Sequence, residues 1–425
     1  MARPDLVAAG ALVDMDAGSS GEAPFIEPRA RLTPADEVER RIAAFQTVLE
    51  ERALDGALIL QNADLYYFSG TIQQSHLYVP AGGPPSLFTR KVVERARRES
   101  PLDDVVALPS TRDLPAAIVA RHGRLPVQLG LELDVLPVRR VRRLQKLFPG
   151  AAFADIGPDV VRLRAVKSAW EIERIAVAAA LADEVFHRAS ELLEEGMTEA
   201  AFAGRVESEA RALGHEGVIR MRGFNQEMFY GQLLSGTSGT AATFLDTPLG
   251  GTGLSPAVAQ GVSFRPIRRG DHVVFDFVAV REGYMADFTR ILVLGRLRDE
   301  LARAYGAALQ VEEAVRAVAR PGVTCGAVWA AAEAAAQTAG LSESFMGVGE
   351  GKVRFVGHGV GLELDELPVL AAGESRLEEG MVFALEPKFV LPGLGAIGVE
   401  NTWRVTEDGI VPLTRASEEV VELPA

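Results

Sequence analysis

Two acidic residues stand inside strongly apolar segments, where burying a carboxylate is costly. Residues 273–280 read Val-Val-Phe-Asp-Phe-Val-Ala-Val and carry Asp276, and residues 284–294 carry Asp287. The intervening Arg-Glu-Gly at 281–283 predicts a hairpin turn. Folding about this turn sets the two aspartates opposite one another within one register step, where cross-strand Cβ atoms lie about 4.5–5.5 Å apart.

A second pair of acidic residues has the same symmetry near the C-terminus. Residues 381–390 and 396–405 are predicted strands that flank Leu-Pro-Gly-Leu-Gly. A hairpin centred on Gly393 places Glu386 opposite Glu400, on one face of the pair. Between the two hairpins, Gly-His-Gly-Val-Gly surrounds His358 with glycines that let backbone approach closely.

Four buried carboxylates that face one another repel unless protons or cations neutralise them. Taken alone, each of the four acids is more typical of a surface or salt-bridged carboxylate, and His358 is more typical of a core histidine. The prediction therefore rests on the placement of all five residues together. An oxygen-rich site with one imidazole suits hard or borderline ions. We therefore predict two divalent ions about 3.5–4 Å apart, Mn²⁺ first and Co²⁺ or Zn²⁺ as alternatives, with a bridging water as the nucleophile.

The remaining sequence predicts the elements that position these residues. Ser168 and Glu171 form a capping-box spacing before a helix to about residue 195, and Thr198 caps another to about 213. Two more helices, 297–319 and 324–339, precede the later strands. Upstream, a helix over 35–53 and a strand over 56–60 begin an alternating pattern. We predict an N-terminal extension (1–34), an α/β domain (35–165) and an α+β domain (166–425).

Composition sets further limits. The chain has 425 residues, 48% hydrophobic and 24% charged, with a net charge of −14, which disfavours nucleic acid and anionic membranes as partners. Residues 1–165 contain 21 basic and 21 acidic side chains, whereas 166–425 contain 23 and 37, so the acidic excess belongs to the second domain. With Cys325 as the single cysteine, no signal peptide and no long apolar run, we expect a cytoplasmic protein.

The five candidate ligands resemble, in order and spacing, the metal ligands of the M24 peptidases of the prolidase, aminopeptidase P and creatinase branch. The matching segments are Asp276, Asp287 in Ala-Asp-Phe-Thr-Arg, His358 in Gly-His-Gly-Val-Gly-Leu-Glu-Leu, Glu386 in Leu-Glu-Pro, and Glu400 in Gly-Val-Glu-Asn-Thr-Trp-Arg-Val-Thr. The resemblance spans residues 35–425 and implies a pita-bread C-terminal domain, a homodimer and hydrolysis of Xaa-Pro bonds by two metals.

The resemblance also implies a division of roles among the ligands. Asp276 would bind one ion, and Asp287 and Glu400 would bridge both. His358 and Glu386 would complete the sphere of the other ion, and Glu386 is in addition a candidate catalytic residue.

Four positions depart from the family pattern. Tyr230 and Asp365 stand where the branch has two substrate-site histidines, Lys388 where it has glycine after Glu-Pro, and Gly398 where it often has arginine. Tyr230 can donate to an oxyanion, and Arg222, or Arg220 on the same predicted strand, can supply positive charge. A salt bridge at the rim is the alternative for both arginines. Asp365 can bind a cationic group of a substrate, and the alternative is that it turns away to a surface arginine and has no effect on the substrate.

These residues predict a dinuclear-metal hydrolase of short peptides, either an Xaa-Pro dipeptidase or an aminopeptidase, in which a metal-bridging hydroxide attacks the scissile carbonyl. The replaced histidines leave room for altered specificity. Two alternatives remain: a metal-dependent amidohydrolase of a non-peptide substrate, and a metal-binding protein with little peptidase activity.

Overall fold

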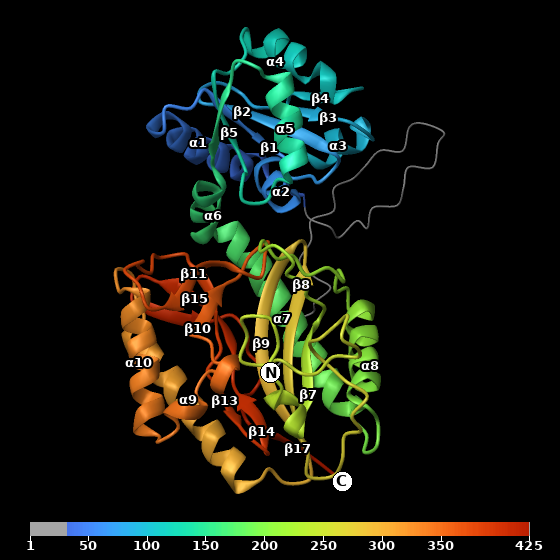
Figure 1. Ribbon diagram of the computed structural model, residues 1–425, viewed down its shortest axis with the longest axis vertical. Coiled ribbons are helices and arrows are strands. Elements are labelled where there is room, and N and C mark those ends of the chain that lie inside the picture. The colour runs from blue at the N-terminus through green and yellow to red at the C-terminus, as the bar shows by residue number, and fades with distance from the viewer. Residues whose placement is uncertain (1–31, 425) are drawn as a thin grey trace, which may run out of the picture. The chain divides into compact units, whose positions relative to one another are not determined.

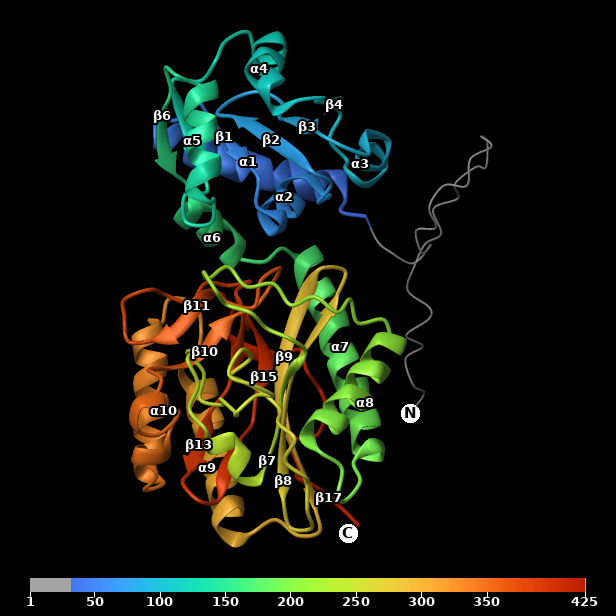
Figure 2. The same cartoon turned by 45° about the vertical axis from the view of Figure 1, so that its right-hand side comes forward.

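The computed structural model describes residues 32–424, and the chain divides into two compact units, residues 1–157 and 158–425 (Figures 1 and 2). The predicted extension 1–34 lies almost wholly outside the described residues. Helix α6 (Gly157–Ala165) begins at the division between the units and ends at the predicted domain boundary, which itself stays a prediction. No helix between residues 32 and 424 is both long enough and apolar enough to cross a membrane.

The first unit is built on a six-stranded sheet in the order β4-β3-β2-β1-β5-β6, with β2 antiparallel to both of its neighbours and the other pairs parallel. This arrangement confirms the predicted α/β class. Its helices are α1 (Ala35–Glu51), α2 (Asn62–Ser69), α3 (Val93–Glu99), α4 (Leu114–His122) and α5 (Val138–Leu147); its strands are β1 (Gly56–Ile59), β2 (Ser75–Pro80), β3 (Ser86–Thr89), β4 (Val105–Ala107), β5 (Gln128–Leu131) and β6 (Ala152–Asp155).

The second unit combines two larger sheets, a two-stranded ladder and two pairs of long helices. The sheets run β17-β9-β8-β7 and β11-β10-β12-β15-β16, and β13 pairs with β14. The helices are α7 (Ala169–Leu192), α8 (Glu199–Ala212), α9 (Asp299–Val318) and α10 (Cys325–Thr338). The strands are β7 (Gly231–Ser235), β8 (His272–Arg281), β9 (Tyr284–Leu294), β10 (Phe355–Gly359), β11 (Glu366–Ala371), β12 (Val382–Leu385), β13 (Lys388–Leu391), β14 (Gly395–Gly398), β15 (Asn401–Thr406), β16 (Gly409–Pro412) and β17 (Val421–Leu423).

Three of the four long helices of the second unit begin at a capping residue that the sequence marks. Ser168 and Glu171 form the capping box of α7, and Thr198 and Thr324 accept backbone hydrogen bonds as the N-caps of α8 and α10. The first helical pair packs on β7–β9, and the second on the strands around β10–β14 (Figure 1). The two halves of the unit therefore repeat a helix pair followed by carboxylate-bearing strands.

In β8 and β9, successive side chains point to opposite faces of the sheet, so the residues that pack on the helices and the two aspartates lie on different faces. Phe275 and Phe288 point to the helix side and meet Phe186 of α7 edge-on, with ring centroids 5.3 and 6.0 Å away. Asp276 and Asp287 are one residue out of phase with these rings and therefore lie on the opposite face. The aromatic face anchors the strands, so the carboxylates are held in a fixed sheet.

The ladders refine the predicted registers. Asp276 pairs with Thr289, and Asp287 pairs with Val278, so the two aspartates are diagonal neighbours on one face rather than direct partners. In the C-terminal hairpin, Lys388 pairs with Gly398 and Leu385 with Asn401, a register that is symmetric about Gly393, as predicted.

Each long strand of this hairpin is split in two: β12 ends before Glu386 and β13 begins after Pro387, because proline cannot donate to a ladder. On the facing side, β14 ends at Gly398, and Glu400 instead bridges to Thr289 of β9.

Gly231 allows β7 to approach the strand that carries Asp276. Its φ is +146°, and a Cβ atom there would lie 2.1 Å from the Asp276 carbonyl oxygen. We predict that Gly231→Ala lowers the free energy of unfolding by more than about 1 kcal/mol, because the β7–β8 ladder must shift. Urea unfolding followed by circular dichroism measures this change.

The matched control is Gly306→Ala in α9, where a Cβ atom would meet nothing within 4 Å. Removing a helical glycine should raise stability by roughly 0.5–1 kcal/mol. Equal effects of the two substitutions would contradict the proposed close approach at Gly231.

Candidate metal centre

The four predicted carboxylates and the imidazole converge on one cavity of about 570 Å³. Asp276 and Asp287 reach it from β8 and β9, and His358 from β10. Glu386 and Glu400 come from the breaks between strands described above. All four acids are buried, and the His358 side chain is 20% exposed, on the solvent side of the cluster. Residues separated by more than 120 positions are thus brought together by the two hairpins.

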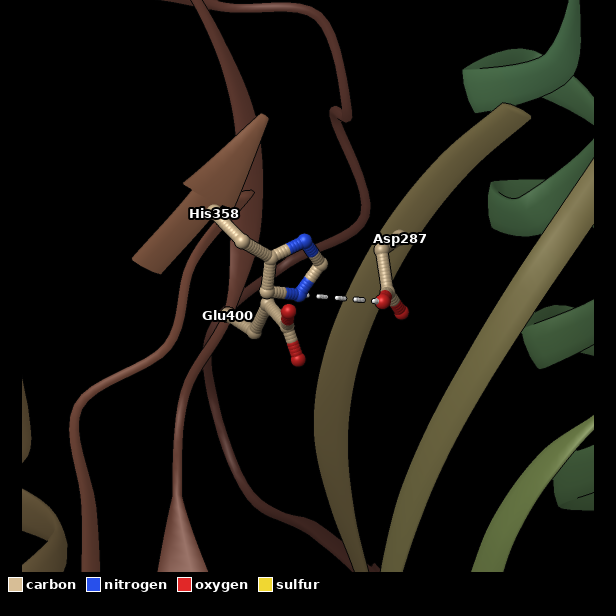
Figure 3. Close-up of side chains that lie close together, drawn as sticks. All are labelled: Asp287, His358 and Glu400. Atoms are coloured by element: carbon tan, nitrogen blue, oxygen red, sulfur yellow. Dashed lines mark ion pairs between the residues drawn. The ribbon is translucent and has the colours of Figure 1, made fainter. Parts of the chain in front are cut away.

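Three of these side chains form a geometry suited to a metal ion. One ligand atom each of Asp287, His358 and Glu400 lies within 4.8 Å of the others (Figure 3). His358 Nε2 is 3.9 Å from Asp287 Oδ2 and 3.8 Å from Glu386 Oε1. These separations are too long for direct hydrogen bonds and leave space for a cation among the atoms.

Burial dominates the electrostatics of the two aspartates. It raises the pKa of Asp287 well above the ordinary value, and the nearby Glu400 and Asp276 carboxylates raise this pKa further. Burial also raises the pKa of Asp276, although the Lys388 ammonium opposes that shift. An unshielded cluster therefore favours protonation, and a cation in the cluster would favour the ionised carboxylates instead.

Lys388 contributes a cation that the sequence analysis left without a role. Its Nζ lies 2.6 Å from Asp276 Oδ2, 2.8 Å from Glu386 Oε2 and 2.8 Å from Glu400 Oε2. Burial acts to lower the pKa of Lys388, but the three carboxylates outweigh it and hold this pKa well above the usual range. The lysine is therefore a charged member of the site.

The donor set fits a divalent ion on the side of the cluster away from Lys388. Asp287 Oδ1 and Glu400 Oε1 are buried and have no hydrogen-bond partner within residues 32–424. Carboxylate oxygens and an imidazole nitrogen are suitable ligands for Mn²⁺, Co²⁺ or Zn²⁺. Unsatisfied buried carboxylate oxygens are costly, and a bound cation would satisfy them.

Two supporting residues were missed by sequence reasoning. Thr289 Oγ1 lies 3.0 Å from Asp276 Oδ2 and 2.7 Å from Glu400 Oε2, so it joins the two strand systems. Gln232 pairs with Asp276 across β7–β8, lines the cavity, and has no partner for its amide atoms within the described chain. The register of β7 against β8 identifies Gln232, and sequence alone does not supply that register.

The structure does not bring Tyr230 or Arg222 to the cavity wall. The Tyr230 ring stacks on His215 with centroids 4.4 Å apart, and burial raises the pKa of its hydroxyl. The Arg222 guanidinium lies 3.5 Å from Glu363, as in the salt-bridge alternative. Their predicted catalytic roles stay predictions. Asp365 does line the cavity, and its carboxylate accepts hydrogen bonds from the backbone N–H groups of Arg222 and Gly223.

A buried ion-pair cluster stabilises the turn that follows His358. Glu366 contacts Arg164 and Lys167, and accepts hydrogen bonds from the backbone of Leu362 and Glu363. Burial alone would raise the pKa of Glu366, but Arg164 and Lys167 outweigh it and lower this pKa to about 2. Because Glu366 opens β11, which pairs with the His358 strand, this cluster helps to fix the imidazole.

Fold and site together define a metal-dependent hydrolase, and comparison with known proteins specifies the family. Residues 173–407 match metallopeptidase family M24, and residues 41–166 match the Creatinase/Prolidase N-terminal domain. The chain belongs to metallopeptidase family M24, in its prolidase branch, and its C-terminal unit has the pita-bread fold. The resemblance read from the sequence is confirmed.

The similarity to individual proteins extends over nearly the whole chain. The Xaa-Pro dipeptidase of Lactobacillus delbrueckii subsp. lactis is 26% identical over 390 residues, covering 89% of this chain and 98% of that protein. The probable dipeptidase PepE of Mycobacterium tuberculosis is 29% identical, covering 93% and 99%. The crystal structure of dipeptidase PepE from Mycobacterium ulcerans has a TM-score of 0.74 at 28% identity, covering 93% and 100%.

The low pKa of Glu366 predicts a loss of stability in acid. A folded-state pKa of about 2 against the ordinary 4.5 contributes stability that is present above pH 4.5 and is lost as the pH falls toward 2. Between pH 7 and pH 3, we expect the wild-type protein to lose about 2 kcal/mol more unfolding free energy than Glu366→Gln. Urea titrations at a series of pH values measure this difference.

The control for this experiment is Glu343→Gln, which removes an exposed glutamate of the same unit. It should reproduce the wild-type pH dependence. If the Glu366→Gln and wild-type curves run parallel in acid, the charge of Glu366 does not stabilise the turn.

Proposed function

We propose that this metallopeptidase hydrolyses short peptides with proline after the scissile bond, and that Xaa-Pro dipeptides are its first substrate class. The observation that carries the proposal is the convergence of Asp287, His358 and Glu400, together with Asp276 and Glu386, in one cavity. The names of the relatives, an Xaa-Pro dipeptidase and two dipeptidases, support the substrate class.

The residues of the cavity divide into those that hold the metal and those that contact the peptide. Asp287, His358, Glu386 and Glu400 would hold a divalent ion, which when bound polarises the scissile carbonyl and lowers the pKa of a water. Glu386 keeps its predicted catalytic role, because its Oε1 faces the same space as His358 Nε2.

The cavity wall offers groups that suit the ends of a short peptide. Lys352 and Arg354 line it and can attract a C-terminal carboxylate. Gln232 brings an amide that has no partner in the described part of the chain, and Met221 and Met228 supply adaptable apolar surface for a side chain. A volume of about 570 Å³ suits a small ligand rather than a folded protein.

Three finer features belong to the same proposal. Mn²⁺ is the proposed metal, because the ligands are mostly carboxylates. A homodimer is proposed from the family resemblance, and a cytoplasmic location from the single cysteine, Cys325.

The test is a panel of peptides incubated with protein that has been stripped by a chelator and reloaded with Mn²⁺. We expect cleavage of Xaa-Pro dipeptides, loss of cleavage on renewed chelation, and a decrease in kcat/KM of about 100-fold or more in Asp287→Ala. Mass spectrometry identifies the products.

Three further substrates separate the alternatives. A tripeptide with proline second distinguishes an aminopeptidase from a dipeptidase, and Xaa-Ala dipeptides test the need for proline. Cleavage of a non-peptide amide alone would favour the amidohydrolase alternative. A metal-loaded protein that cleaves none of these substrates would contradict the proposed function.

We propose that Asp365 recognises the charge of the substrate. Its carboxylate stands on the cavity wall, where it adds negative charge near a bound peptide. We expect Xaa-Pro substrates with a positive group near the scissile bond to be preferred, and Asp365→Asn to abolish this preference while metal content is unchanged.

The ratio of kcat/KM for cationic and neutral peptides is the measurement, and it provides its own control. Because Asp365 also accepts hydrogen bonds from the Arg222 and Gly223 backbone, the substitution can loosen that segment and lower both values together. Equal ratios in the two proteins would show that Asp365 does not read substrate charge.

A further inference from the structure

We propose that the Lys388 ammonium occupies one of the two cation positions of this site, so that the protein binds a single divalent ion, held by Asp287, His358, Glu386 and Glu400. The inference rests on the proposed metal-dependent function and revises the count of two ions expected from the sequence.

The contacts of Lys388 are those of a cation enclosed by the cluster. Its three N–H donors face one oxygen each of Asp276, Glu386 and Glu400, at 2.6–2.8 Å, and its side chain is 2% exposed. Every donor of the ammonium is therefore satisfied, which is the condition for a stable buried charge. A metal ion binds carboxylate oxygens at about 2.0–2.6 Å, so it cannot share this position with the ammonium.

The carboxylates divide their oxygens between two sides. Glu386 and Glu400 direct Oε2 to Lys388, and Asp276 Oδ2 and Glu400 Oε2 also contact Thr289. The other side presents Glu386 Oε1 near His358 Nε2, together with Asp287 Oδ1 and Glu400 Oε1, which have no hydrogen-bond partner within residues 32–424. One face is thus filled by the lysine, and the opposite face retains the atoms of one metal site.

Charge favours the same division. Four ionised carboxylates and one ammonium carry three net negative charges, and one divalent ion reduces this excess to one. A second divalent ion would reverse the sign of the cluster if Lys388 stayed in place. To take the position of the lysine, the ion would instead have to displace the ammonium from three hydrogen bonds in a buried environment.

The residue that pairs with Lys388 in the β13–β14 ladder leaves room for the lysine side chain. Lys388 pairs with Gly398 across β13–β14, and a Cβ atom at Gly398 would lie 2.6 Å from Lys388 Cγ and 2.5 Å from the Pro387 carbonyl oxygen. The two departures noted in this hairpin, a lysine and a glycine, therefore face each other. The missing side chain at Gly398 permits Lys388 to point into the cluster.

The experiment measures metal content rather than activity. Wild type, Lys388→Gly and Lys388→Ala are stripped with chelator, equilibrated with excess Mn²⁺, freed of unbound metal, and analysed for manganese per chain. We expect one equivalent in the wild-type protein and two in both variants. Electron paramagnetic resonance should then show an exchange-coupled Mn²⁺ pair in the variants and an isolated ion in the wild type.

The control is Lys352→Ala, which removes an exposed lysine of the same cavity wall that does not touch the carboxylates. It should bind one equivalent, like the wild type. Circular dichroism identifies a variant that has not folded. If Lys388→Gly is unfolded, Lys388→Ala decides the result, because alanine keeps a side chain in the ladder.

Two outcomes would overturn the inference and leave the proposed function standing. One is two equivalents in the wild-type protein, and the other is a single equivalent in the folded Lys388 variants. A different outcome, no manganese in any of the proteins, would instead refute the proposed metal-dependent function itself.

Discussion

The catalytic unit depends on one constraint: four carboxylates lie buried within an apolar domain, and their repulsion must be balanced by positive charge. Asp276 and Asp287 are held on β8 and β9, and Glu386 and Glu400 lie in buried breaks between strands, so the acids cannot move apart to relieve the repulsion. Positive charge is therefore a structural requirement of this fold as well as a chemical resource. Lys388 supplies part of it from within the chain.

The scaffold meets this constraint through strand geometry. Phe275 and Phe288 pack against α7 and fix one face of β8 and β9, and the same alternation presents Asp276 and Asp287 to the other face. The C-terminal hairpin crosses the site with its ladder interrupted at Pro387, which frees Glu386 from strand pairing. Thr289 joins the two strand systems through Asp276 and Glu400.

The site lies in a chain of family M24, and groups beyond the five candidate ligands contribute to its charge. Membership in the family rests on matches to both domains. Around the five candidate ligands, Lys388 enters the cluster, and Asp365 and Gln232 stand on the cavity wall. The Asp365 carboxylate contributes to the charge near a bound substrate, and the Lys388 ammonium reduces the negative charge that a metal ion has to balance.

Local signals along the chain predict the starts of α7, α8 and α10, the two hairpins and the five candidate ligands, because capping residues, apolar strands and turn positions act over a few neighbouring residues. Which polar groups face the cavity depends instead on the tertiary structure. It turned Tyr230 onto His215, brought Gln232 beside Asp276, and directed Lys388 inward opposite Gly398. Side-chain direction depends on ladder register and on the space left by neighbours, and neither is written in the order of residues along one segment.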